Sequence, residues 1–187
     1  YVFSGSQRHL LADMFENPDR PLYRHCQKMV LERIDAADYR KFFERAAKAR
    51  WNKGIGSELA DQILSLTYRH PYYVNALCSR LWSNARLPTA KGIGKTWREI
   101  VAEDAAFVAH HVRTLSATQR AMLVGIAGAG PVEHPTGREF LARCRLSAST
   151  GSQAKDVLEA EDLIRQNEER HWELVDPVMA EYIRENS

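Results

Sequence analysis

The order of the predicted elements in residues 113–187 constrains the fold more than any other feature of the sequence. One helical segment begins at Ser116 and ends at Gly128–Pro131, a second begins at Thr136, and a third follows a turn at residues 147–152. Two short strands then flank a polar turn; they are residues 163–165 and 171–175. Three helices followed by a two-stranded ribbon predict a winged helix-turn-helix, whose third helix is the recognition helix in a DNA-binding member.

The charges on this third helix argue against DNA as its main ligand, because a DNA-binding face needs several Lys or Arg side chains to neutralise phosphates. We expect Ala154, Val157 and Leu158 to face inward. The outward positions and the wing turn then carry one cation against four carboxylates: Ser152, Gln153, Lys155, Asp156, Glu159, Glu168 and Glu169. A protein partner is therefore expected more than DNA. DNA contact through a basic edge stays an alternative; this edge consists of Arg138, Arg143 and Arg145.

The front of the chain begins with an apolar run, Tyr1–Phe3, which is followed by small polar residues and an arginine. This run predicts a buried strand, and Gln27–Ile34 predicts a second. Compact hydroxyls and a cation at the carboxyl end of a strand suit a nucleotide-binding sheet, although a short strand before a capped helix is the simpler interpretation. A sheet this small has an exposed edge that tends to pair with another copy, so a homo-oligomer is one expectation.

Helical periodicity predicts a helix over residues 8–16 and only helices from residue 35 to the winged helix. One apolar stripe is formed by Tyr39, Phe42, Phe43 and Ala46. Pro71 stands at the first position of another helix. Residues 84–96 predict a loop before a long helix from Trp97. Within that loop, Gly94-Lys95-Thr96 is similar to the end of a phosphate-binding loop, but Thr89 stands where that motif requires glycine, so we reject this interpretation.

The composition is that of an ordinary globular protein, with 44% hydrophobic and 27% charged residues, and no apolar run is long enough to span a membrane. The cysteines, Cys26, Cys78 and Cys144, are scattered and form no CxxC pair, which argues against disulfide and zinc frameworks and favours the cytoplasm. His110 and His111 are adjacent on a helix and point in different directions, so no metal site is expected.

Three motifs together resemble the carboxy-terminal portion of archaeal and bacterial P-loop ATPases related to the AAA+ and STAND classes and to origin-recognition initiators. The first is YVFSGSQR followed by MFENPDRPLYR, the second is YRHPYYVNALCSRLW, and the third is LEAEDLIRQNEERHWELVDPVMAEYI. They occur in the order of that family and span nearly the whole chain. The resemblance implies a mainly α chain with a remnant of an α/β P-loop core (two strands), a helical lid bundle and a carboxy-terminal winged helix-turn-helix.

The resemblance also implies roles for individual residues. Ser6 and Arg8 match the sensor-1 end of a core strand, near the γ-phosphate of ATP. Arg20 and Arg24 match the region where relatives carry an arginine finger, which stabilises charge that develops during phosphoryl transfer; loop salt bridges are the alternative. Arg69, His70 and Pro71 match the Gly-His-Pro-like motif of the lid. Arg69 stands where the family usually has glycine, so either it supplies a sensor-2-like cation or the turn differs.

The glycine-rich loop and the acidic strand that bind ATP and magnesium in such ATPases are absent from this sequence, so we expect no hydrolysis by this chain alone and no bound cofactor. We expect them in a missing amino-terminal P-loop half of the same protein. The alternative function is a stand-alone winged-helix regulator that binds DNA or protein. The expected parts are a core remnant (1–34), a helical lid (35–90), a linker and long helix (91–112) and the winged helix-turn-helix (113–187).

Overall fold

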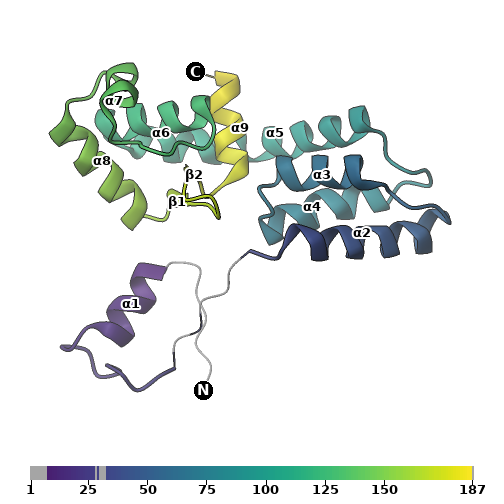
Figure 1. The fold of residues 1–187 in the computed structure, drawn as a ribbon, viewed down its shortest axis with the longest axis horizontal. Helices are drawn as coiled ribbons and strands as arrows, with labels where there is room; N and C mark the ends of the chain where they lie inside the picture. The colour runs from purple at the N-terminus through teal and green to yellow at the C-terminus, as the bar shows by residue number, and fades with distance from the viewer. Residues whose placement is uncertain (1–7, 28, 30–32, 187) are drawn as a thin grey trace. The chain divides into compact units, whose positions relative to one another are not determined.

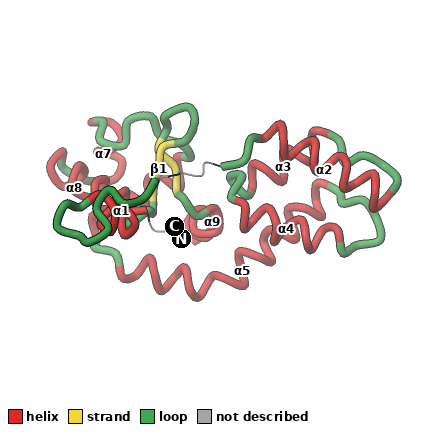
Figure 2. The backbone as a smooth tube through the Cα atoms, turned by 90° about the horizontal axis from the view of Figure 1, so that it is seen from below, coloured by secondary structure: helices red, strands yellow, loops and turns green. Residues whose placement is uncertain are grey.

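The computed structural model describes residues 8–27, 29 and 33–186 (Figure 1). The prediction of a mainly α-helical chain is confirmed, since helices form most of the described residues and the strands are short (Figure 2). The expected strand at Tyr1–Phe3 lies outside the described residues. The expected strand at Gln27–Ile34 falls partly outside them, and its described residues, which are 27, 29, 33 and 34, are in neither a helix nor a strand.

Contacts within the chain divide it into two compact units. The first contains the described residues before 32 together with 112–175, and the second contains the described residues from 33 to 111 together with 176–186. The first unit includes α1 (Arg8–Glu16), which has the predicted bounds. A turn follows α1, in which the Arg24 backbone N–H donates to the Phe15 carbonyl.

The second unit is built on four helices that lie side by side in Figures 1 and 2: α2 (Ala36–Trp51), α3 (Ser57–Leu66), α4 (Pro71–Trp82) and α5 (Ala90–Thr114). Each helix contributes at least one large side chain that is almost fully buried, among them Phe43, Ile63, Leu77 and Trp97. Burying such side chains is the main favourable contribution to folding. Phe42, predicted to face this core, is 53% exposed, because the buried positions of α2 are Tyr39, Phe43 and Ala47.

The long helix α5 begins at Ala90 and not at Trp97, so the predicted loop over residues 84–96 is too long. Thr89 caps the helix, since its hydroxyl accepts a 3.1 Å hydrogen bond from the Gly92 N–H. Ile93 is fully buried and extends the apolar stripe of Trp97 by one turn. Gly94-Lys95-Thr96 therefore lies inside a helix and not in the predicted loop.

The winged helix is formed by α6 (Ala117–Ala129), α7 (Arg138–Cys144), α8 (Ala148–Ala160), β1 (Ile164–Gln166) and β2 (Trp172–Leu174). Strands β1 and β2 are antiparallel, and Gln166 lies opposite Trp172. Val132 adds an isolated bridge to Trp172 through backbone hydrogen bonds of 2.9 and 2.7 Å. Helix α6 contacts α7, α8 and β2, so it forms the centre of this core.

Helix α8 begins at Ala148, within the segment that was predicted to be a turn. Ser147 and Thr150 form a capping box, in which each side chain accepts a hydrogen bond from the other residue's backbone N–H. Val157, predicted to face inward, is 38% exposed. The core face of α8 is formed by Gly151, Ala154 and Leu158 instead.

A last helix, α9 (Pro177–Asn186), was not predicted. Asp176 caps it, because its Oδ1 accepts hydrogen bonds from the backbone N–H groups of Val178 (2.8 Å) and Met179 (3.1 Å). Pro177 occupies the first helical position, where its missing N–H costs nothing. The helix belongs to the same compact unit as α2–α4.

Candidate functional site

The turn that joins α3 to α4, residues 67–71 and here called the α3–α4 turn, contains the predicted Arg69, His70 and Pro71. It ends α3 as a Schellman motif: the Arg69 N–H donates to the Leu64 carbonyl (3.1 Å) and the Tyr68 N–H to the Ser65 carbonyl (3.3 Å). The Thr67 side chain is fully buried and its hydroxyl donates back to the Ile63 carbonyl. These bonds fix the path of the chain into α4.

Two consecutive residues of this turn have left-handed backbone conformations, with φ of 49° at Tyr68 and 55° at Arg69. This region favours glycine, because a Cβ atom there crowds the following carbonyl. The sequence left open whether Arg69, at a position where the resembling family usually has glycine, means that the turn has a different backbone. Its positive φ is one that glycine adopts readily, so the backbone here is compatible with a glycine at this position.

Guanidinium groups from distant parts of the sequence gather at the same turn. Arg33 donates to the Tyr68 carbonyl, and Arg184 on α9 donates to the Tyr68 hydroxyl. Arg184 also pairs with Glu181 at 2.8 Å. Burial raises the pKa of the Tyr39 phenol. The charges of Arg33 and Arg69 lie close enough to oppose this shift in part.

Helix α4 starts directly at the end of this turn. His70 precedes its first residue in an extended conformation, and its ring lies 5.1 Å from that of Tyr73. Pro71 occupies the first helical position, as predicted. The first backbone N–H groups of a helix have no partner within it and attract anions. Together with the nearby guanidinium groups, this helix start can hold an anionic group such as a phosphate.

Tyr73 and Asp176 link α4 to α9. The Tyr73 hydroxyl donates a 3.0 Å hydrogen bond to Asp176 Oδ2, and Tyr73 is 8% exposed. Burial raises the pKa of Tyr73, and the Asp176 carboxylate raises it further. Its neighbour Tyr72 is 66% exposed.

The four residues predicted to be catalytic lie in the other unit or outside the described part. Ser6 is outside the described residues, and Arg8 is the first residue of α1, with a side chain that is not described. Arg20 forms a 2.5 Å ion pair with Asp13, in which both side chains are about half exposed. Arg24 has a φ of 55°, and its guanidinium lies 5.2 Å from the centre of the Tyr23 ring.

The face of α8 that would read DNA offers little free positive charge. Lys155 Nζ lies 2.6 Å from Glu159 and 3.3 Å from Asp156, and its side chain is 19% exposed. Burial alone would lower the pKa of Lys155, but hydrogen bonds to these two carboxylates raise it overall. The lysine also lies over the Trp172 ring, 4.4 Å from its centre. The charge of Lys155 is therefore already paired with carboxylates of the same helix.

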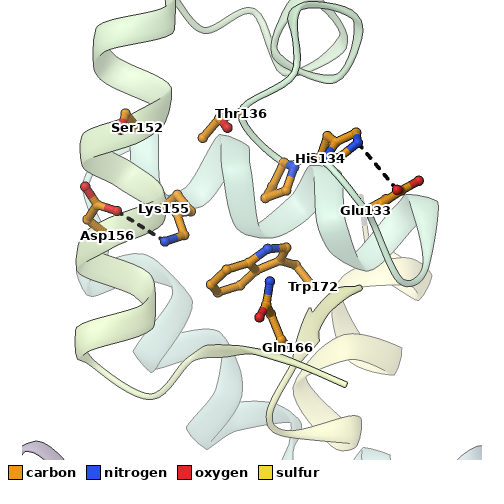
Figure 3. Close-up of a pocket in the computed structure, with 9 residues that line it drawn as sticks. Glu133, His134, Thr136, Ser152, Lys155, Asp156, Gln166 and Trp172 are labelled. Atoms are coloured by element: carbon orange, nitrogen blue, oxygen red, sulfur yellow. Dashed lines mark hydrogen bonds and ion pairs between the residues drawn. The ribbon is translucent and has the colours of Figure 1, made fainter. Parts of the chain in front are cut away.

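A cleft of about 370 Å³ opens beside this lysine. Figure 3 shows Lys155 and Asp156 of α8 along one wall, Glu133 and His134 opposite, and Trp172 with Gln166 at the base. Thr136 and Ser152 complete the polar lining. Lys155, Asp156 and Ser152 were predicted from the sequence as outward residues of α8. The other lining residues were not predicted, because they come from the α6–α7 loop and the strands, and no sequence spacing relates those segments to α8.

The described residues contain no group of three or more His, Cys, Asp or Glu side chains that could hold a metal ion. None of their helices combines the length and the apolar character that a membrane span requires.

Comparison with known proteins agrees with this architecture. Residues 107–185 match the model of a family described as a probable winged helix domain. Among solved structures, the chain is similar to the Walker-type ATPase paby2304 of Pyrococcus abyssi, with a TM-score of 0.70 and 18% identity over 96% of this chain and 51% of that one. Comparison with curated proteins gave no match. The chain thus spans about half the length of that ATPase and shares its fold over that half.

Proposed function

We propose that this chain is the lid and winged-helix portion of an ATP-binding molecular-switch ATPase of the AAA+/STAND type. The observation that carries the proposal is the likeness of nearly the whole chain, 96% of it, to about half of a Walker-type ATPase. A shared winged helix alone would cover only residues 107–185, whereas this likeness extends through α2–α5 as well. In this proposal ATP and magnesium bind to the protein that contains the P-loop half, in the cytoplasm.

The α3–α4 turn is the part of this chain that we assign to the nucleotide. Arg69 and the start of α4 supply positive charge and unpaired backbone donors, which suit a phosphate group. His70 and Pro71 set where that helix begins. Arg20 and Arg24 are the candidates for a finger that reaches a neighbouring subunit's nucleotide, since an arginine stabilises the transition-state charge of phosphoryl transfer. Ser6 and Arg8 are proposed to sense the γ-phosphate.

We propose further that the winged helix contacts protein and not DNA. The single cation on the outward face of α8, Lys155, is held by Asp156 and Glu159 and packs on Trp172. DNA approaching α8 would therefore meet carboxylates without a free cation to offset them. The competing function, a stand-alone winged-helix regulator of DNA, would need Arg138, Arg143 and Arg145 to carry the contact.

The test begins with the reading frame on the amino-terminal side of Tyr1, which should encode GxxxxGK[ST] and an acidic strand. The protein that includes this segment should hydrolyse ATP. Replacing Arg20 or Arg24 by Ala should lower kcat by on the order of a thousandfold if that residue is the finger. Arg45→Ala, which removes an exposed arginine from α2, is the matched control. A frame without a glycine-rich loop, or a longer protein without ATP turnover, would contradict the proposal.

A further inference from the structure

The charged side chains that line the cleft between α8 and the wing favour a positively charged ligand over a negatively charged one. The ionised side chains of the cleft are Glu133, Asp156 and Lys155, and the lysine is already paired with Glu159 as well as Asp156. The two carboxylates thus outnumber the one lysine, and the lysine already forms ion pairs within α8. Glu133 lies 3.5 Å from His134 Nε2 and Asp156 lies 3.3 Å from Lys155, but these two carboxylates are 69% and 66% exposed, so a cationic ligand can still reach them, whereas an anionic ligand would meet only the paired lysine and His134.

Neutral groups of the cleft also have hydrogen-bonding capacity to spare. Within the described part of the chain, no side-chain hydrogen bond is formed by Thr136, Ser152 or Gln166. The same holds for the indole N–H of Trp172, a residue that is 8% exposed. Thr136, Ser152 and Gln166 are exposed, so a ligand in the cleft can reach these groups. The cleft therefore offers acceptors to a cation and one indole donor to a carbonyl oxygen, side by side in Figure 3.

We propose that this cleft binds an arginine side chain of a basic protein segment. A guanidinium carries five donors in a plane, so it can bond to two carboxylates and to the neutral acceptors at once. The volume of about 370 Å³ admits such a side chain together with part of its backbone, whose carbonyl can accept from the indole. The proposal builds on the assignment of the winged helix to protein partners and adds the site and the chemistry of the partner.

The experiment titrates the full chain with acetyl-Gly-Ser-Arg-Ser-Gly amide and follows the indole N–H signals of the four tryptophans by NMR. The same peptide with citrulline in place of arginine keeps the shape and removes the charge. The arginine peptide should shift the signal of Trp172, which the Trp172→Phe variant identifies, and the citrulline peptide should not. Glu133→Gln and Asp156→Asn should each weaken binding by about tenfold or more, since a charge-assisted hydrogen bond is lost.

Glu139→Gln and Glu161→Gln are the matched controls, because both carboxylates are exposed on the same unit and neither lines the cleft. They should leave the affinity unchanged. Equal shifts with arginine and citrulline, or equal losses in the cleft variants and the controls, would overturn the arginine site. Duplex DNA is titrated in parallel. DNA binding that is lost in Lys155→Ala would overturn the protein-partner assignment itself, whereas failure of the peptide without DNA binding would overturn only the arginine site.

Discussion

The hydroxyl of Tyr73 on α4 donates a 3.0 Å hydrogen bond to Oδ2 of Asp176, whose other oxygen caps α9. One carboxylate thus joins the helix that follows the α3–α4 turn to the last helix of the segment that matches a winged helix. The bond is partly buried, and Tyr73 itself is 8% exposed. It gives the second unit a polar link between residues far apart in the sequence.

Tyr73→Phe removes this hydrogen bond and leaves the ring in place. We expect the free energy of unfolding to fall by about 1–3 kcal/mol, because the acceptor is a partly buried carboxylate that loses its partner. Asp176→Ala should cost at least as much, since it also removes the cap of α9. Tyr72→Phe, at an exposed neighbouring hydroxyl, should change little. Thermal or urea unfolding measures all three, and equal stability of the Tyr73 and Tyr72 variants would contradict the role of the bond.

The backbone of Arg69 predicts an unusual response to glycine. At a φ of 55° glycine relieves a steric cost of about 1 kcal/mol that any other residue pays. Arg69→Gly should therefore be more stable than Arg69→Ala by roughly that amount. Both variants lose the guanidinium, so comparing them isolates the backbone effect. Urea unfolding with the alanine variant equal to or above the glycine variant would show that this conformation is not strained.

Ser147 sets the start of α8 through its capping box with Thr150. Ser147→Ala should lower the free energy of unfolding by about 1 kcal/mol. Ser149→Ala, two residues later at an exposed position of the same helix, removes the same hydroxyl without removing a cap and should be neutral or slightly stabilising. Calorimetric unfolding of the two variants separates a cap from an ordinary serine, and equal midpoints would argue against the cap.

The cysteines should differ strongly in reactivity. Burial raises the pKa of the Cys78 thiol to about 12. At pH 8 only about 0.01% of such a thiol is ionised, and the thiolate is the species that reacts. Cys26 is exposed. Iodoacetamide at pH 8 followed by peptide mass spectrometry should therefore modify Cys26 well before Cys78. Fast modification of Cys78 in the folded protein would mean that the thiol is accessible and ionised.

Local signals in the sequence were sufficient for several elements. The apolar spacing gave the bounds of α1, and Pro71 marked the start of α4, because a proline without an N–H is tolerated only in a first turn. The missed helix α9 carried the same kind of signal, an aspartate followed by Pro177. Thr89 and Ser147 were also caps, and each starts its helix earlier than the apolar pattern alone indicated.

The surroundings of the candidate sites were not predictable in this way. Arg33 and Arg184 reach Tyr68 from distant segments, and nothing in their local sequence indicates that meeting. The exposure of Phe42 and Val157 likewise depends on which helix packs on which face. The cleft beside α8 combines a loop, a helix and two strands, so its lining follows from tertiary packing.

The central claim is that this chain supplies the lid and winged helix to an ATPase whose phosphate-binding half is encoded before Tyr1. Calorimetric titration with magnesium ATP tests it most directly, with this chain and the protein extended through the glycine-rich loop measured side by side. The account predicts weak or no binding by the chain alone and clear binding by the longer protein, because a phosphate-binding loop holds the phosphates. Micromolar affinity of the chain alone, or no binding by the longer protein, would contradict it.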